Sequence, residues 1–296
     1  MVCGSCIGVM ALGAIFGLIL LAIKLRQKKS ASLKNKHVLV TGGSLGIGKC
    51  VALEAARRGA HVTIIARNVE NLERAVSEIK SAMDLSSKFE TLDQAVEKLE
   101  ESVAPVFMLV NCAGTAVCGK LEDMSDNDIK YLLNLNVLGT MFPCKALVPR
   151  MKARKEGHIV ITASQAALLG IFGYSVYSAT NLPPDTDTPG FAEEEKSKPQ
   201  ETRLISESAG LVSPERVANQ MLDDALNYNF FSTVGFESAM LTTACAGMAP
   251  FSSFRELAIQ VCSAGVLRIV SVLVLHQFNR IVSKCQRDRD TNKKAE

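Results

Sequence analysis

The chain has 296 residues, of which 48% are hydrophobic, and this is enough apolar material for one α/β domain with a large core. Its net charge of +3 is close to balanced, it has no Trp, and 5% of its residues are aromatic, so neither charge nor base stacking supports nucleic-acid binding. The nine cysteines form no metal-type cluster apart from a weak Cys3-x-x-Cys6 pair, which indicates reduced thiols, a cytosol-facing domain and no metal site.

The N-terminal segment resembles a membrane anchor. Met1–Ile23 carries no charge, and its length reaches the roughly 20 residues that span a bilayer. A cleaved signal peptide has positive charge before its apolar run, whereas here the charge follows in Lys24–Lys29. This asymmetry favours a retained anchor over residues 1–25 and places the following domain in the cytosol.

A βαβ unit follows the anchor. The apolar runs His37–Thr41 and His61–Ala66 predict buried parallel strands, and Lys49–Arg58 between them predicts a helix. A Gly-rich loop, Thr41–Gly48, joins the first strand to this helix, where its backbone can approach a pyrophosphate at the helix N-terminus. The residues of this loop expected to contact a nucleotide are Gly42, Ser44, Leu45, Gly46 and Gly48. In this context a tight turn without a ligand is the less favoured interpretation.

The residue after the second strand indicates which cofactor is bound. An NAD site usually has an acidic residue here to hold the ribose hydroxyls, but this chain has Arg67 followed by Asn68. A guanidinium suits the 2′-phosphate of NADP through charge-assisted hydrogen bonds. We therefore expect NADPH rather than NADH, with a plain surface arginine as the alternative.

Further along the chain, the spacing of apolar residues predicts two more helices and a strand. The helices cover Asn71–Met83 and Asp93–Val103, and the strand covers Val106–Val110. The strand leads into Asn111-Cys-Ala-Gly114.

These motifs, in this order, resemble the short-chain dehydrogenase/reductase family over Lys36 to about Gly190. The resemblance implies a Rossmann-type doubly wound parallel sheet, with Asn111 beside the cofactor. It assigns the family's catalytic Asn to Asn136 and its Ser to Ser164, which ends the predicted strand His158–Ser164. Tyr177, 13 residues further on, matches the catalytic Tyr.

The same resemblance implies roles for these three residues. Tyr177 gives a proton to the developing alkoxide, Ser164 holds the carbonyl oxygen, and Asn136 carries the water of a proton relay. Each residue also has an ordinary structural explanation, because a Ser often caps a helix, a Tyr is often half-buried core, and an Asn often lies in a turn.

Later segments are similar to the 3-ketodihydrosphingosine reductase family. The similarity lies in Pro183–Ala192 and Thr202–Ser206, and it continues in Ser213–Ala218 and Cys245–Pro250. It implies NADPH-dependent reduction of a long-chain 3-keto sphingoid base at the cytosolic face of the endoplasmic reticulum membrane. The dehydrogenase domain is expected over residues 36–250.

The chain departs from the family at its active-site Tyr-x-x-x-Lys motif, because Asn181 replaces the Lys. That Lys lowers the pKa of the Tyr and holds the nicotinamide ribose, and Asn181 brings no charge. The helix and sixth strand that should follow are also missing, a deletion of roughly 25–30 residues on usual element lengths. Alternative splicing or a gene-model error would each produce such a join.

A second gap is expected near Met83, because no apolar run for the third strand precedes Asp84. Asp84 would then be the acid on the adenine side, and Phe107 stands where the family commonly has an Asp. Loss of strands 3 and 6 leaves sheet edges unpaired and removes a wall of the substrate pocket. We interpret the chain as a poorly active form.

The C-terminal region is apolar and then basic. Leu257–Leu275 is interrupted by Arg268, which is costly inside a membrane span, so a monotopic or re-entrant segment is favoured over a full span. We expect a membrane-associated segment over 251–280 and a basic cytosolic tail over 281–296. Lys293 and Lys294 resemble a di-lysine retrieval signal of endoplasmic reticulum proteins, or form part of a solvated tail.

Two other functions stay open. One is a non-catalytic, membrane-tethered NADP-binding or interaction protein, which the loss of the Lys favours. The other is a steroid or retinol reductase of the same superfamily, which also carries an N-terminal anchor. A homo-oligomer is compatible with all of these interpretations.

Overall fold

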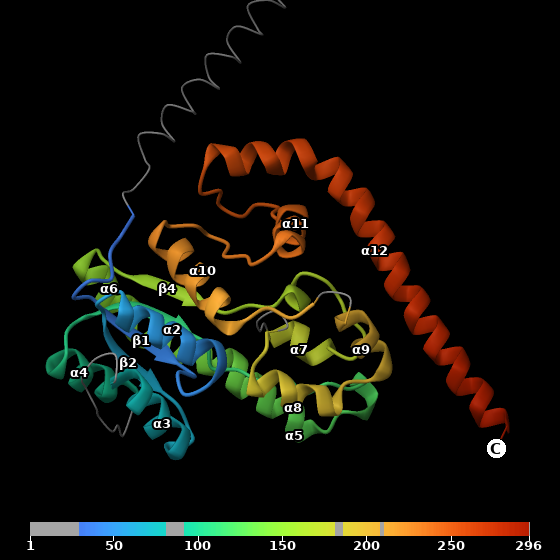
Figure 1. Cartoon of the computed structure of the whole chain (residues 1–296), viewed down its shortest axis with the longest axis horizontal. Helices are drawn as coiled ribbons and strands as arrows, with labels where there is room; N and C mark the ends of the chain where they lie inside the picture. The colour runs from blue at the N-terminus through green and yellow to red at the C-terminus, as the bar shows by residue number, and fades with distance from the viewer. Residues whose placement is uncertain (1–29, 81–91, 181–185, 208–209, 296) are drawn as a thin grey trace, which may run out of the picture.

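The computed structural model describes residues 30–80, 92–180, 186–207 and 210–295. Within these residues the fold is a parallel sheet with helices on both faces (Figure 1), which confirms the predicted α/β class. The sheet has four strands in the order β2-β1-β3-β4 in the described part of the chain. These are β1 (His37–Thr41), β2 (His61–Ile65), β3 (Val106–Asn111) and β4 (His158–Ile161).

The side chains of β1 alternate between the two helical layers. Val38 and Val40 pack with α2 (Gly46–Arg57) and α10 (Pro214–Leu226). Leu39 packs on the opposite face with α4 (Leu92–Ser102) and α6 (Gly139–Arg154). All three side chains are fully buried, which explains why the strand is continuously apolar.

A bulge in β3 changes the position of Phe107. His37 pairs with Val106, but the next residue of β1 pairs with Met108, so Phe107 is an extra residue in the ladder. As a result, Phe107 and Met108 both lie in the core beside α2 and α10. The aromatic residue at this position is thus a core residue of this sheet.

The predicted helices form with shifted ends. α2 begins three residues before the predicted Lys49, and α3 covers Val69–Lys80 instead of Asn71–Met83. The strand predicted over His158–Ser164 is shorter than expected, because pairing with β3 ends at Ile161. Asp84 and the expected site of the missing third strand fall in 81–91, outside the described residues.

Several short helices gather at the carboxyl ends of the strands (Figure 1). The first group runs from η1 (Leu121–Asp123) through α5 (Asp126–Leu132) to the π-helix η2 (Leu133–Leu138). The second group consists of η3 (Gln165–Ala167), α7 (Ser175–Thr180), α8 (Pro189–Ser197) and α9 (Gln200–Ser206). Side-chain caps start two of these helices, with Ser125 accepting from the Asp128 N–H at 3.1 Å and Thr188 from the Phe191 N–H at 3.2 Å.

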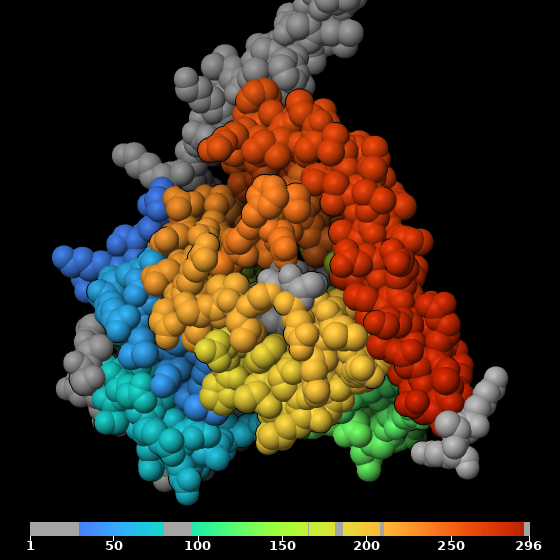
Figure 2. Space-filling model, turned by 45° about the vertical axis from the view of Figure 1, so that its right-hand side comes forward, coloured from blue at the N-terminus to red at the C-terminus, as the bar shows by residue number. Residues whose placement is uncertain are grey.

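The chain ends in α11 (Phe236–Ala244) and the long helix α12 (Phe254–Ala295). Figure 2 shows α12 along one side of the molecule with its outer flank uncovered. Within the described residues, one helix is long and apolar enough to cross a membrane, namely Phe254–Asn292. The boundary that we expect between the membrane-associated segment (251–280) and the basic tail (281–296) falls inside α12. The predicted anchor over 1–25 lies outside the described residues.

The sheet ends at β4 in the described residues, and this strand is only half-covered. Ile159 is 37% exposed and Ile161 is 52% exposed. Beyond this strand the chain forms one isolated parallel bridge, Thr186 to Val212. The bare flank of β4 lies where a sixth strand was expected to be missing.

Candidate active site

The Gly-rich loop is tight because two parts of the backbone meet inside it. Gly42 has φ +69°, and a methyl group placed on it would lie 2.8 Å from the Cα of Ala113. A methyl group on Gly48 would lie 2.4 Å from the carbonyl oxygen of Gly42. Both positions therefore need glycine for the backbone itself, and the loop brings the ends of β1 and β3 together.

Asn111 holds this junction from the end of β3. Its Oδ1 accepts a hydrogen bond from the Thr41 hydroxyl at 3.3 Å, and its Nδ2 donates to the Cys144 sulfur at 3.4 Å. The Thr41 oxygen in turn accepts from the Ala113 N–H at 3.3 Å. Asn111 is buried, so its side chain shapes the loop from the inside.

The N-terminus of α2 begins at Gly46, and the residue that caps α8 lies next to this glycine. Leu45 precedes α2 in an extended conformation and gives the helix no side-chain cap, which leaves N–H groups of its first turn for another acceptor. A methyl group on Gly46 would lie 3.0 Å from Thr188 Cγ2, the residue that caps α8. Ser44 beside them is buried. The uncapped N–H groups at the positive end of α2 fit an anionic pyrophosphate.

Arg67 lies two residues beyond the end of β2, and its side chain is exposed. One of its N–H groups donates to the Tyr131 hydroxyl at 3.1 Å, and the guanidinium lies 5.7 Å from the centre of that ring. A guanidinium has five N–H donors, and this bond uses one of them. The residue thus fits a phosphate group, although its contact with Tyr131 of α5 was not expected.

Asn136 is buried in the π-helix η2, an element that often marks functional sites. Its Nδ2 donates to the Thr115 carbonyl at 3.0 Å and to the Thr180 hydroxyl at 2.9 Å, and its Oδ1 accepts from the Thr115 N–H at 3.0 Å. Asn136 therefore joins the segment after β3 to the last residue of α7. Asn181, which follows directly, lies outside the described residues.

Tyr177 lies on α7 in a small buried cluster with Cys118, Ala166 and Tyr174. The N–H of Ala166 donates to the Ser164 Oγ at 3.0 Å, so Ser164 caps η3 beside this cluster. The Thr180 hydroxyl donates to the Tyr177 carbonyl at 3.0 Å. Contacts thus lead from Asn136 through Thr180 of α7 to Tyr177, and Ser164 bonds to Ala166 in the same cluster as Tyr177.

Sequence reasoning missed a polar network next to Tyr177. The ring of Tyr174 lies 4.9 Å from that of Tyr177, and its hydroxyl donates to the Glu194 carboxylate in α8. Glu194 also pairs with Lys198 at 3.2 Å, and the Lys198 side chain is fully buried between Glu194 and Glu195. The three-residue spacing of the tyrosines and the four-residue spacing of the ion pair were visible, but both are common on helices.

Cys118 is affected by this network. Burial and the negative charge of Glu194 together raise the pKa of its thiol to about 12. Burial likewise raises the pKa of Cys112, beside the Gly-rich loop, to about 11. Both thiols are therefore neutral at physiological pH and are not nucleophiles.

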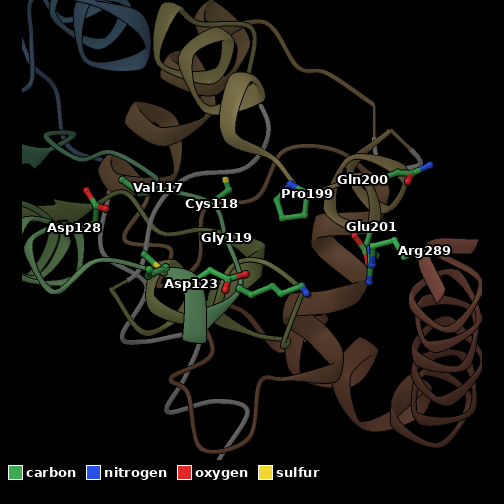
Figure 3. Close-up of a pocket in the computed structure, with 11 residues that line it drawn as sticks. Val117, Cys118, Gly119, Asp123, Asp128, Pro199, Gln200, Glu201 and Arg289 are labelled. Atoms are coloured by element: carbon green, nitrogen blue, oxygen red, sulfur yellow. The ribbon is translucent and has the colours of Figure 1, made fainter. Parts of the chain in front are cut away.

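An open cavity of about 410 Å³ lies beside the cluster (Figure 3). Cys118 and Gly119 form one side, and Glu201 of α9 and Arg289 of α12 form another, where the two side chains make an ion pair. Glu201 is 1% exposed, so Arg289 neutralises a buried carboxylate. Through Cys118, the cavity adjoins the Tyr177 cluster and offers space for a substrate.

Comparisons with known proteins agree with these motifs. Residues 36–182 match the family model described as short chain dehydrogenase. The chain is 38% identical to the 3-ketodihydrosphingosine reductase of Mus musculus, over 87% of this chain and 88% of the relative. It is 36% identical to the 3-dehydrosphinganine reductase of Danio rerio, over 90% of this chain and 92% of the relative.

Solved structures show the same fold. A short chain dehydrogenase/reductase family protein aligns with a TM-score of 0.55 at 27% identity and covers 68% of this chain and 94% of its own. Levodione reductase aligns with a TM-score of 0.58 at 18% identity and covers 66% and 93% of the two chains. About a third of this chain thus lies outside the part aligned with these structures.

Proposed function

This chain belongs to the short-chain dehydrogenase family, and from that premise we propose that it binds NADPH and reduces a long-chain 3-keto sphingoid base to the 3-hydroxy compound. Its relatives in Mus musculus and Danio rerio are named for this reaction, and the similarity covers most of both chains. We place the catalytic domain at the cytosolic face of the endoplasmic reticulum membrane, which the apolar helix α12 supports.

The observation that carries this proposal is the set of contacts around Tyr177. Asn136 bonds to Thr180 on the same helix as Tyr177, and Ser164 caps the short helix whose Ala166 packs against Tyr177. These three residues come from separate segments of the chain. Their connection to one buried cluster through short hydrogen bonds supports a carbonyl-reducing site of this family.

Each residue has a defined role in the proposed reaction. NADPH supplies the hydride that reduces the ketone carbon. The Ser164 hydroxyl donates a hydrogen bond to the carbonyl oxygen, and the Tyr177 hydroxyl donates the proton that this oxygen takes up. Asn136 keeps α7 in register with the segment after β3, and the proton returns to Tyr177 from water.

We further propose that the reaction is slow in this chain. A positive charge within about 4–6 Å of a phenol lowers its pKa and stabilises the phenolate left after proton donation. Asn181 is neutral and stands where the family has its Lys. The nearby Lys198 is already paired with two glutamates and so adds little net positive charge.

Turnover and cofactor binding test this function together. We expect purified full-length protein in detergent to bind NADPH and to form 3-hydroxy product slowly, as detected by mass spectrometry. Asn181→Lys should raise the rate by about tenfold or more, since one pKa unit of the Tyr can change the rate by up to tenfold. Tyr177→Phe should abolish turnover with NADPH binding intact. Equal activity of Tyr177→Phe and the parent chain would contradict the mechanism.

A separate test addresses the cofactor. Losing charge-assisted hydrogen bonds costs about 1.5–3 kcal/mol, or roughly 10–100-fold in affinity. Arg67→Ala should weaken NADPH binding by that factor and leave NADH binding within twofold. The exposed Lys130→Ala is the matched control on the neighbouring helix α5. An equal loss of NADPH and NADH affinity in Arg67→Ala would show that Arg67 does not bind the 2′-phosphate.

The second candidate function is a non-catalytic, membrane-tethered NADP-binding protein. The neutral Asn181 and the bare flank of β4 favour it. NADPH binding without turnover on long-chain keto bases or on a steroid panel, with no gain from Asn181→Lys, would select this function over the reductase.

A further inference from the structure

The inner face of α12 is attached to the protein along much of its length. Leu267 and Cys285 are buried, and Arg289 pairs with the buried Glu201 of α9. At about 100° per residue, these three positions lie within ~40° of one another around the helix axis. One side of α12 therefore faces the protein body, and the opposite side is available for another contact.

The opposite side begins as an apolar surface. Ile269 is 65% exposed and Leu273 is 63% exposed, with Val266 beside them at 64%. These residues lie ~100–160° around the helix from Cys285. Their window of the helix has a mean hydropathy of 2.1, and apart from Leu267 its side chains are at least partly exposed. A surface of this kind is unstable in water and needs an apolar environment.

The same side then becomes basic. Exposed side chains on it, one turn apart, are His276, Arg280, Lys284 and Arg287. They lie within ~80° of one another and roughly opposite Cys285. The segment from 276 to 287 contains no carboxylate, and the nearest ones, Asp288 and Asp290, come only after Arg287.

We propose that this outer side of α12 is a docking surface for a lipid leaflet rich in anionic phosphate headgroups. Ile269, Leu273 and their neighbours enter the acyl region, and Arg280, Lys284 and Arg287 bind headgroup phosphates. Because the apolar and basic parts share one side of a single helix, both reach a membrane that lies along the helix. The occupant must be both apolar and anionic, and an anionic leaflet meets both requirements.

The attached inner face also decides how α12 meets the bilayer. The side of α12 that carries Leu267 contacts α11 and α9, and these contacts hold α12 to the protein body. If α12 spanned the bilayer, this contacting side would lie inside the membrane. His276 to Arg287 covers about 16 Å of helix, longer than the headgroup zone of ~5–8 Å per leaflet that an upright helix would cross. The helix thus lies along the leaflet, and the exposed Arg268 on its flank can reach the headgroups.

A fluorescent reporter can test this proposal without measuring turnover. The chain contains no Trp, so Leu273→Trp introduces a single indole on the outer side of α12. Full-length protein carrying this change is reconstituted into vesicles of neutral phosphatidylcholine, or of phosphatidylcholine with phosphatidylserine, each with brominated acyl chains. We expect a blue-shifted emission and strong quenching in the anionic vesicles, and at least twofold weaker quenching in the neutral ones.

Neutralising the basic residues provides the decisive comparison. Each cation near an anionic surface contributes about fivefold to binding, so Arg280→Gln, Lys284→Gln and Arg287→Gln together should weaken the anionic-lipid preference by roughly 100-fold. The control removes the same charge from α5 and the end of α6, through Lys130→Gln, Lys152→Gln and Lys155→Gln, all exposed positions. This control should leave the quenching unchanged.

Three outcomes would overturn the proposal. Equal quenching in neutral and anionic vesicles would show that α12 does not bind anionic headgroups. An equal loss of quenching in both triple variants would show that the preference for anionic lipid comes from the net charge of the protein and not from the basic residues of α12. An unquenched, blue-shifted indole would show that protein covers this side of α12, and cross-linking at position 273 would then identify a second copy as the occupant.

Discussion

Asn136 and Asn134 offer a matched pair of substitutions on one π-helix. Asn136 is buried and makes three hydrogen bonds, two to the backbone of Thr115 and one to the Thr180 hydroxyl. Asn134 is exposed, two residues away on the same element. Replacing each with Ala removes the same atoms, so the difference between the variants measures what the buried contacts contribute.

The expected difference follows from those three bonds. A typical hydrogen bond contributes about 1 kcal/mol net, and a buried partner left unpaired costs about 1–3 kcal/mol. Asn136→Ala should therefore lower the free energy of unfolding by about 3 kcal/mol, while Asn134→Ala should change it by less than ~0.5 kcal/mol. At about 2–4 °C per kcal/mol for larger domains, the Tm should fall by roughly 6–12 °C for Asn136→Ala.

Thermal and urea unfolding of the full-length protein in detergent would measure this difference, with NADPH affinity as a second readout. Because Asn136 connects the segment after β3 to α7, we expect Asn136→Ala also to weaken NADPH binding. A Tm difference below 2 °C between the two variants would refute the structural role assigned to Asn136, since no arrangement with these three bonds predicts so small a loss.

Other positions give equally direct tests. Gly42 and Gly210 both have a left-handed φ, of +69° and +71°, but a methyl group on Gly42 would clash with backbone, whereas one on Gly210 would meet nothing within 4 Å. Gly42→Ala should therefore lower the stability more than Gly210→Ala does. Calorimetry should also show at least a tenfold loss of NADPH affinity for Gly42→Ala. A double-mutant cycle of Tyr174→Phe and Glu194→Gln should give a coupling of about 1.5–3 kcal/mol in unfolding experiments, and a coupling near zero would refute this bond. Burial lowers the pKa of His37 below its ordinary 6.5, so the neutral imidazole stabilises the folded protein fully above pH 6.5 and this stabilisation is lost as the pH falls. His37→Gln should therefore make the free energy of unfolding, measured with urea, less dependent on pH in the acid range.

The parts of the site that depend on local spacing could be predicted from sequence. The Gly-rich loop lies between β1 and α2 as expected, and Asn111 ends β3 beside it. Local patterns carry this information because a tight turn needs glycine and a buried strand needs consecutive apolar residues. Arg67 was also placed correctly, since its position follows from the end of β2.

Features that depend on contacts distant in sequence could not be predicted. The bulge at Phe107 results from the register of β1 on β3, and no residue type marks it. The bond between Arg67 and Tyr131 joins residues 64 apart in the sequence. The attachment of α12 through Arg289 to Glu201 spans 88 residues, and in the sequence Arg289 is one of several charges in a basic tail.

The ion pair between Arg289 and Glu201 places α12 between the cavity and the surroundings of the protein. Arg289 lines the cavity from the inner side of the helix, and the exposed apolar residues Val266, Ile269 and Leu273 lie on the outer side about 24–35 Å further along it. At Arg289 the helix alone, about 10–12 Å thick with its side chains, separates the cavity from the basic part of that outer side. For a substrate that stays in a bilayer, the concentration that governs turnover is its mole fraction among the lipids. Diluting it with inert lipid should slow the reaction, whereas adding buffer should not.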